Sequence, residues 1–340
     1  MTSNDRDEAY SSEKVDNGTH ATRIETDGAV IDVVTGEEFE PVVTFKTWIV
    51  VLILSCGYGL SFWPIPAMAN NGGLVATDLG QPTSYVWYIP AWTISITCCF
   101  MICGANTDLL GRRWFLVGGN LVSTVGHIIV ASAKHPNTVI TSMAIAGFGG
   151  GNCQMAAFAL PELLPNKWRH IGVVIADITT LMAVIIAPIT DLYGFHTGSW
   201  QWNFWAAAIA QFLSFLGLFL LYFPPAHPYG LPTKQLINEI DYVGMVIFIC
   251  GAVPVLAGIV WTTIVPSNDA HVVAALVIGF AFIVAFALWE TFSKTKHPLR
   301  PTYVFASSRG RDFTVPTIVL AVVNIASKHD SVSCHLWWTP

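Results

Sequence analysis

Charged residues are scarce in this sequence, because Asp, Glu, Lys and Arg together make up only 11% of its 340 residues. Soluble globular proteins carry about 25% charged residues, so the composition excludes a body whose whole surface faces water. The few charges are also unevenly distributed. Residues 1–46 hold 4 basic and 11 acidic residues, whereas the remainder holds 12 and 11, so the net charge of −6 comes from the N-terminal tail.

Several motifs that carry chemistry are also missing. There is no phosphate-binding loop, which argues against ATP-driven pumping, and no nucleophile elbow, metal-binding helix pair or dinucleotide fingerprint. The seven cysteines have neither metal-ligand spacing nor the placement of a disulfide framework, so we expect mainly buried thiols. We therefore predict that the protein is not an enzyme, has no catalytic residues, and binds no metal, cofactor or nucleic acid.

The acidic N-terminal segment lacks the apolar residues that a folded core requires, and it lacks the basic start of a cleaved signal peptide. We expect residues 1–44 to form a disordered, acidic tail on the cytoplasmic side of a membrane. The first apolar run would then act as an uncleaved membrane signal.

Long apolar runs fill the rest of the chain, and 53% of all residues are hydrophobic. A helix that spans a bilayer needs about 20 mostly apolar residues, and only helices satisfy the backbone of such segments in hydrocarbon. We predict an all-α membrane protein with about 8–9 transmembrane helices, since a soluble helical core would need polar faces that these runs lack. The runs are 46–68, 84–104, 114–133, 138–160, 171–191, 203–223, 242–264 and 272–292, with a ninth that begins near 313 and fades by about 326.

Basic residues are concentrated in alternate loops between these runs. With the N-terminus inside, the inside segments hold 14 Lys and Arg residues and the outside loops hold 1. Basic residues accumulate on the cytoplasmic side of membrane proteins. The count therefore predicts a cytoplasmic N-terminus and a cytoplasmic turn at Gly104–Arg113.

The turn GANTDLLGRR, Gly104–Arg113, concentrates charge between the second and third runs. Its pattern Gly-xxx-Asp-xx-Gly-Arg-Arg resembles the loop 2–3 signature of the major facilitator superfamily. We expect Gly104 to allow close helix approach, and the arginines to contact lipid headgroups or pair with Asp108. An Arg112–Glu162 ion pair is a further expectation, with a solvated charge cluster as the alternative. The resemblance implies that this turn belongs to a conformational latch, with a topology signal as the alternative. The latch residues would be Gly104, Asp108, Gly111, Arg112, Arg113, Glu162 and Arg169.

A second resemblance begins after the third of these loops. The stretch AGFGGGNCQMAAFALPELLPNKWRHIGVVIAD, followed by WQWNFW and IDYVG, is similar to the fungal trichothecene efflux pump family of the 14-helix drug:proton antiporter branch. The similarity covers about residues 45–320. It implies proton-coupled efflux of small amphipathic toxins or drugs. The protein would lie in the plasma membrane or, alternatively, in the vacuolar membrane. Siderophore–iron import by the same fold, and a non-transporting truncated membrane protein, are the alternative functions.

The resemblance also predicts the domain boundaries. Residues 45–223 would form the N-terminal six-helix bundle, 224–292 a short linker with two extra transmembrane helices, and 293–326 a cytoplasmic loop with the start of a ninth helix. The anomalous tail 327–340 is polar and resembles nothing in the family, so we expect the C-terminal half to be missing. Because substrate sites in such folds lie between two halves, we expect little transport from this chain alone.

Four residues are candidates for proton coupling or for lining a substrate cavity. Asp177 lies roughly 10 Å into the fifth run at about 1.5 Å per residue, where a carboxylate usually faces a cavity or a partner. It is predicted to bind the coupling proton or a substrate cation, with a structural hydrogen bond as the alternative. Asn152 and Gln154 are predicted to bind substrate or, alternatively, to join helices, and Pro188 to kink its helix within an antiporter-like motif.

Overall fold

The computed structural model describes residues 23–26, 29–32, 43–223, 240–292, 315–316 and 318–319. The chain separates into two units, residues 1–43 and 44–340. In the first unit, strands β1 (Arg23–Thr26) and β2 (Ala29–Asp32) form an antiparallel hairpin with Ile24 opposite Ile31. The hairpin departs from the expected disorder at these residues, because its β-branched side chains favour extended backbone. A two-stranded hairpin is only marginally stable alone. The other residues of 1–42 lie outside the described residues, so their disorder stays a prediction.

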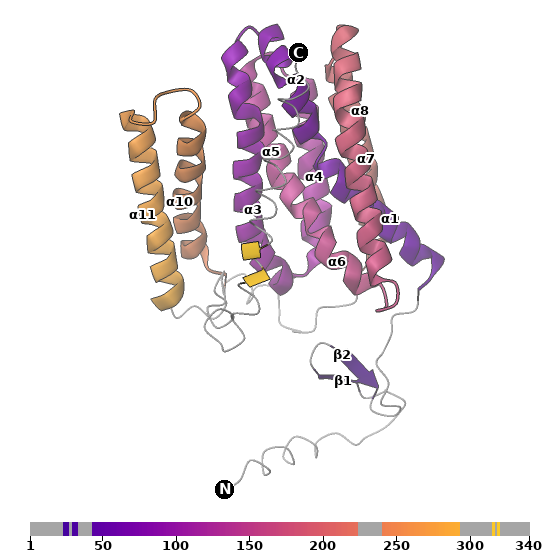
Figure 1. Ribbon diagram of the computed structural model, residues 1–340. Helices are drawn as coiled ribbons and strands as arrows, with labels where there is room; N and C mark the ends of the chain where they lie inside the picture. The colour runs from indigo at the N-terminus through magenta and orange to yellow at the C-terminus, as the bar shows by residue number, and fades with distance from the viewer. Residues whose placement is uncertain are drawn as a thin grey trace. The chain divides into compact units, whose positions relative to one another are not determined.

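The second unit is a bundle of α-helices (Figure 1). A short 3-10 turn, η2 (Pro82–Trp87), precedes the third helix. The helices are α1 (Phe45–Ser61), α2 (Pro64–Asp78), α3 (Tyr88–Leu110), α4 (Arg112–Ala131), α5 (Pro136–Gln154), α6 (Ala156–Leu163), α7 (Arg169–His196), α8 (Gln201–Leu221), α10 (Tyr242–Trp261) and α11 (Ala270–Phe292).

Within the described residues, 7 stretches are long and apolar enough to cross a membrane, namely α1 with α2, α3, α4, α7, α8, α10 and α11. Helix α5 lies in the predicted run 138–160. Its glycines and polar residues make it less apolar, and this is tolerated because most of its residues are buried against neighbouring helices. The predicted all-α membrane bundle is confirmed. The linker 224–239, the loop 293–314, most of the ninth run and the tail 327–340 lie outside the described residues.

The first apolar run is longer than the sequence predicted. Its expected end at residue 68 is wrong, because the chain breaks only briefly at Phe62 and Trp63 and then continues as α2 to Asp78. Pro64 stands in the first turn of α2, where proline fits a helix without losing a backbone hydrogen bond. Asn71 falls after the predicted end of this run, but it is buried inside the bundle.

Glycines on α5 let this helix pass closely between its neighbours. A Cβ atom on Gly147 would stand 2.5 Å from the Trp92 carbonyl oxygen of α3, and one on Gly149 would stand 2.3 Å from the Ser123 nitrogen of α4. These contacts are with backbone atoms that cannot swing aside. The α5 glycines therefore allow close helix approach at these positions, and α3, α4 and α5 pack tightly together.

We predict that Gly149→Ala lowers the thermal stability of the purified protein, because the added methyl group forces α4 and α5 apart. Overpacking of this kind costs about 1–3 kcal/mol. The matched control is Gly118→Ala on α4, where a Cβ meets nothing within 4 Å. Unfolding in detergent should begin at a lower temperature for Gly149→Ala only. Equal melting temperatures for the two variants would contradict the close contact.

Candidate functional site

The turn between α3 and α4 depends on Gly111. This residue has φ 88° and ψ 139°, a conformation open to glycine but rarely adopted by residues with a side chain. Its N–H donates to the Thr107 carbonyl at 3.0 Å, which closes the end of α3. The chain then enters α4 at once, so Arg112 and Arg113 stand in the first turn of that helix. A helix N-terminus disfavours positive charge, and both guanidinium groups therefore need partners.

Arg112 has such a partner in Glu162 on α6. The Arg112 Nη1 and Glu162 Oε1 atoms are 2.8 Å apart, so the expected ion pair is present. Arg169, at the start of α7, donates from Nε to the Leu164 carbonyl at 3.4 Å. Burial raises the pKa of Tyr222, beside this pair, to about 12, with a further increase from Glu162 and an opposing effect of Arg112. Tyr222 thus stays a neutral phenol near the ion pair. The latch role of Arg112, Glu162 and Arg169 stays a prediction.

Arg113 joins α4 to the end of α8. Its Nη2 atom donates to the Phe219 carbonyl at 3.2 Å, and its guanidinium carbon lies 3.8 Å from the centre of the Phe223 ring. Carbonyls in the last turn of a helix lack intrahelical donors and favour positive charge. These contacts compensate the unfavourable position of Arg113 at the start of α4. The side chain of Asp108, the proposed third member of the group, lies outside the described residues.

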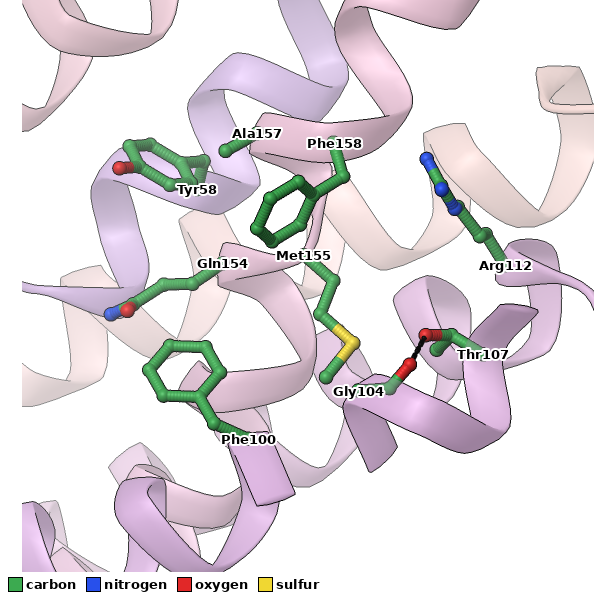
Figure 2. A pocket seen from close by; sticks show the side chains of 9 residues that line it. All are labelled: Tyr58, Phe100, Gly104, Thr107, Arg112, Gln154, Met155, Ala157 and Phe158. Atoms are coloured by element: carbon green, nitrogen blue, oxygen red, sulfur yellow. Dashed lines mark hydrogen bonds between the residues drawn. The ribbon is translucent and has the colours of Figure 1, made fainter. Parts of the chain in front are cut away.

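A cavity of about 580 Å³ opens beside the Arg112–Glu162 pair (Figure 2). This volume lies within the range of small-molecule sites. The expected close helix approach at Gly104 is wrong, because a Cβ there would meet nothing within 4 Å. Gly104 instead leaves space in the cavity wall. The cavity is lined by Tyr58, Phe100, Gly104, Thr107, Arg112, Gln154, Met155, Ala157 and Phe158.

Polar groups lie on two sides of this mostly apolar cavity. Figure 2 shows Tyr58 and Gln154 on one side and Arg112 on the other, with Phe158 and Met155 between them. Gln154 Nε2 also donates to Ser61 Oγ at 3.3 Å, so this amide joins helices and lines the cavity at once. The site can therefore hold an apolar molecule and offer hydrogen bonds at its edges.

The other predicted residues lie outside this cavity. Asn152 is buried and donates from Nδ2 to the Phe148 carbonyl of its own helix at 3.1 Å. Asp177 is exposed on α7, on a face that the described helices leave uncovered. Helix α7 continues through Pro188 to His196, and Pro188 lines a separate hollow of about 450 Å³ between α2 and α7. Of the predicted residues, Gly104, Arg112 and Gln154 therefore line the cavity together, and the other described ones lie outside it.

The sequence interpretation missed a buried polar cluster at the other end of α7. Asp191 is fully buried and accepts hydrogen bonds from Asn71 Nδ2 at 3.0 Å and from Asn203 Nδ2 at 3.3 Å. Asp191 escaped notice because it stood at the end of the predicted fifth run, and Asn71 because it fell between the predicted runs 46–68 and 84–104. An acid inside an apolar run was the available signal, since such residues are usually functional.

A multi-pass helical bundle with an arginine turn at one end and an apolar cavity beside it is the architecture of a membrane transporter of the major facilitator class. Residues 54–332 match the model of the fungal trichothecene efflux pump family, and the chain belongs to this family. The predicted resemblances to the major facilitator superfamily and to this efflux pump family are thereby confirmed.

Individual relatives agree with this assignment. The MFS-type transporter prx5 of Penicillium rubens is 56% identical over 314 residues, a match that covers 92% of this chain and 54% of that protein. The trichothecene efflux pump TRI12 of Fusarium sporotrichioides is 25% identical over 256 residues, covering 74% of this chain and 43% of the pump. The chain thus spans about half the length of the curated relatives it matches. Among solved structures, the POT family transporter PepTSo has a TM-score of 0.49 and 14% identity over 73% of this chain and 53% of that chain, a likeness too weak to support a conclusion.

A double-mutant cycle tests the Arg112–Glu162 pair. Arg112→Gln and Glu162→Gln should each lower stability slightly, and the double variant should lose less than their sum, with a coupling of about 0.2–1 kcal/mol. The coupling is small because the Glu162 side chain is 60% exposed. Added salt should reduce it further. Additive losses in thermal unfolding at low salt would contradict the ion pair.

Proposed function

We propose that the protein is a proton-coupled secondary transporter that exports small amphipathic organic metabolites, with trichothecene-like toxins as the substrate class. The observation that carries this proposal is the cavity of about 580 Å³, whose mostly apolar wall has hydrogen-bonding groups at its edges. The relative from Fusarium sporotrichioides is a trichothecene efflux pump, which supports export as the direction.

In this proposal the cavity binds the apolar body of the substrate, and Tyr58 and Gln154 orient its oxygen atoms. Arg112 belongs both to the cavity wall and to the ion pair with Glu162. The pair would hold the ends of α4 and α6 together in one transporter state and separate in the other, which is the latch function. Asp177, exposed on α7, would bind a proton or the cationic group of a substrate. Asn152 and Pro188 would shape the helices beside the path.

The proposed location is the plasma membrane, with the N-terminus in the cytoplasm. The excess of Lys and Arg in alternate loops supports this orientation. The arginine turn and Glu162 lie at the end of the bundle where α3 and α6 terminate (Figure 1), which would then be the cytoplasmic end. The cavity would take its substrate from the cytoplasm.

Export can be measured in cells that lack the gene. We expect such cells to retain a labelled trichothecene longer than wild-type cells, and collapse of the proton gradient to abolish the difference. Re-expression with Gln154→Leu should restore export only partly, about 2- to 10-fold more slowly than wild type, because one hydrogen bond contributes about 0.5–1.5 kcal/mol.

The matched control is Thr141→Ala, an exposed position on the same helix whose hydroxyl bonds only to the Asn137 carbonyl. This variant should export normally. Deletion cells that keep normal toxin export but grow poorly without iron would instead favour siderophore import.

A further inference from the structure

Asp191 is the one described carboxylate that is fully buried in the core of the bundle, with 0% of its surface exposed. It stands 22 residues beyond Arg169 on α7, roughly 33 Å along the helix at 1.5 Å per residue. It therefore lies at the end of the bundle opposite the Arg112–Glu162 pair. A buried carboxylate is costly unless it is hydrogen-bonded, paired with a cation or protonated.

Two amide groups approach this carboxylate from different helices. Asn71 of α2 donates to Oδ2 at 3.0 Å, and Asn203 of α8 donates to Oδ1 at 3.3 Å. The orientation of the Asn203 amide is fixed, because its Oδ1 atom accepts from Thr190 Oγ1 at 2.8 Å and from Trp63 Nε1 at 3.3 Å. Each carboxylate oxygen of Asp191 thus accepts from one amide, and these hydrogen bonds join α7 to α2 and α8.

Among the residues that the structure describes, the helices that pack around Asp191 place no Lys or Arg beside it. Helix α8 has no ionisable residue, and α2 has only Asp78, which is exposed and accepts from Trp200 Nε1 at 3.1 Å. On α7 the ionisable neighbours are Tyr193 and His196, both exposed, while Arg169, His170 and Asp177 lie toward the other end. On α1, Lys46 lies at the far end, and Cys56 and Tyr58 precede the Trp63 corner.

We propose that Asp191 is a proton-binding site, and that proton uptake by its carboxylate loosens the hydrogen bonds that join α2, α7 and α8. The step is a simple proton transfer, in which a proton from water forms an O–H bond on one carboxylate oxygen and no other bond is made or broken. The oxygen that gains the proton stops accepting from its amide, and the charge that strengthened both contacts is removed. The role of this step in a transport cycle rests on the proposed proton-coupled function.

A proton fits this site better than a metal cation does. Cations such as Na⁺ require several oxygen ligands, whereas the two nearest groups present N–H donors to the carboxylate. Asp177 differs in both respects that matter, because it is exposed and stands on an uncovered face of α7. The buried site can therefore hold its proton through a conformational change.

Infrared difference spectroscopy of the purified protein in lipid nanodiscs tests proton binding directly. Lowering the pH should produce a carbonyl band of a protonated buried carboxyl group, and Asp191→Asn should abolish this band. Asp78→Asn, a control at an exposed carboxylate on α2, should retain it. Asn71→Ala should keep the band but shift its frequency, because the carboxyl group loses one hydrogen bond; this readout remains if Asp191→Asn proves unstable.

The outcomes separate the inference from the proposed function. Survival of the band in Asp191→Asn, its loss in Asp78→Asn, or its removal by NaCl at constant pH would overturn the assignment of a proton to Asp191. Export by wild-type cells that is insensitive to the proton gradient would overturn coupling while leaving the infrared result intact. If both hold, we expect Asp191→Asn to lose the dependence of export on the gradient.

Discussion

Two positive charges at the start of α4 impose the main constraint on this bundle. The tight turn at Gly111 leaves Arg112 and Arg113 at the end of a helix where the backbone itself is electropositive. Arg112 contacts Glu162 on α6, and Arg113 contacts the last turn and the end of α8. One unfavourable feature of the backbone therefore ties three helix ends together. Because Arg112 also lines the cavity, a movement of its side chain away from Glu162 would change the cavity wall directly.

The bundle is close-packed along α5 at Gly147 and Gly149 and opens into the cavity near the end of this helix, at Gln154. Gly147 and Gly149 permit backbone contact with α3 and α4. A Cβ on Gly104, farther along α3, would meet nothing within 4 Å, and the space beside it belongs to the cavity. The same residue type thus produces a tight seam or an opening, depending on whether a neighbouring helix crosses at that height.

The sequence predicted the helices and the arginine turn because both depend on local properties. Apolar runs of membrane length must form helices, and Gly111 must form a turn that few other residues tolerate. The ion pair between Arg112 and Glu162 could also be anticipated, since both residues belong to loops on one predicted side. The cluster at Asp191 could not, because its partners lie 120 residues earlier and 12 residues later in the chain. Hydropathy cannot distinguish an asparagine that ends a helix from one that is buried inside it, and this also concealed the continuation of α2.

The proposed latch depends most on the separation of the Arg112–Glu162 pair during the transport cycle. Spin labels on exposed positions near the start of α4 and the end of α6 would report the distance between these ends by pulsed electron resonance. Two distances are expected, with populations that change when a trichothecene or a proton gradient is applied. A single distance that neither the substrate nor the gradient alters would contradict the latch.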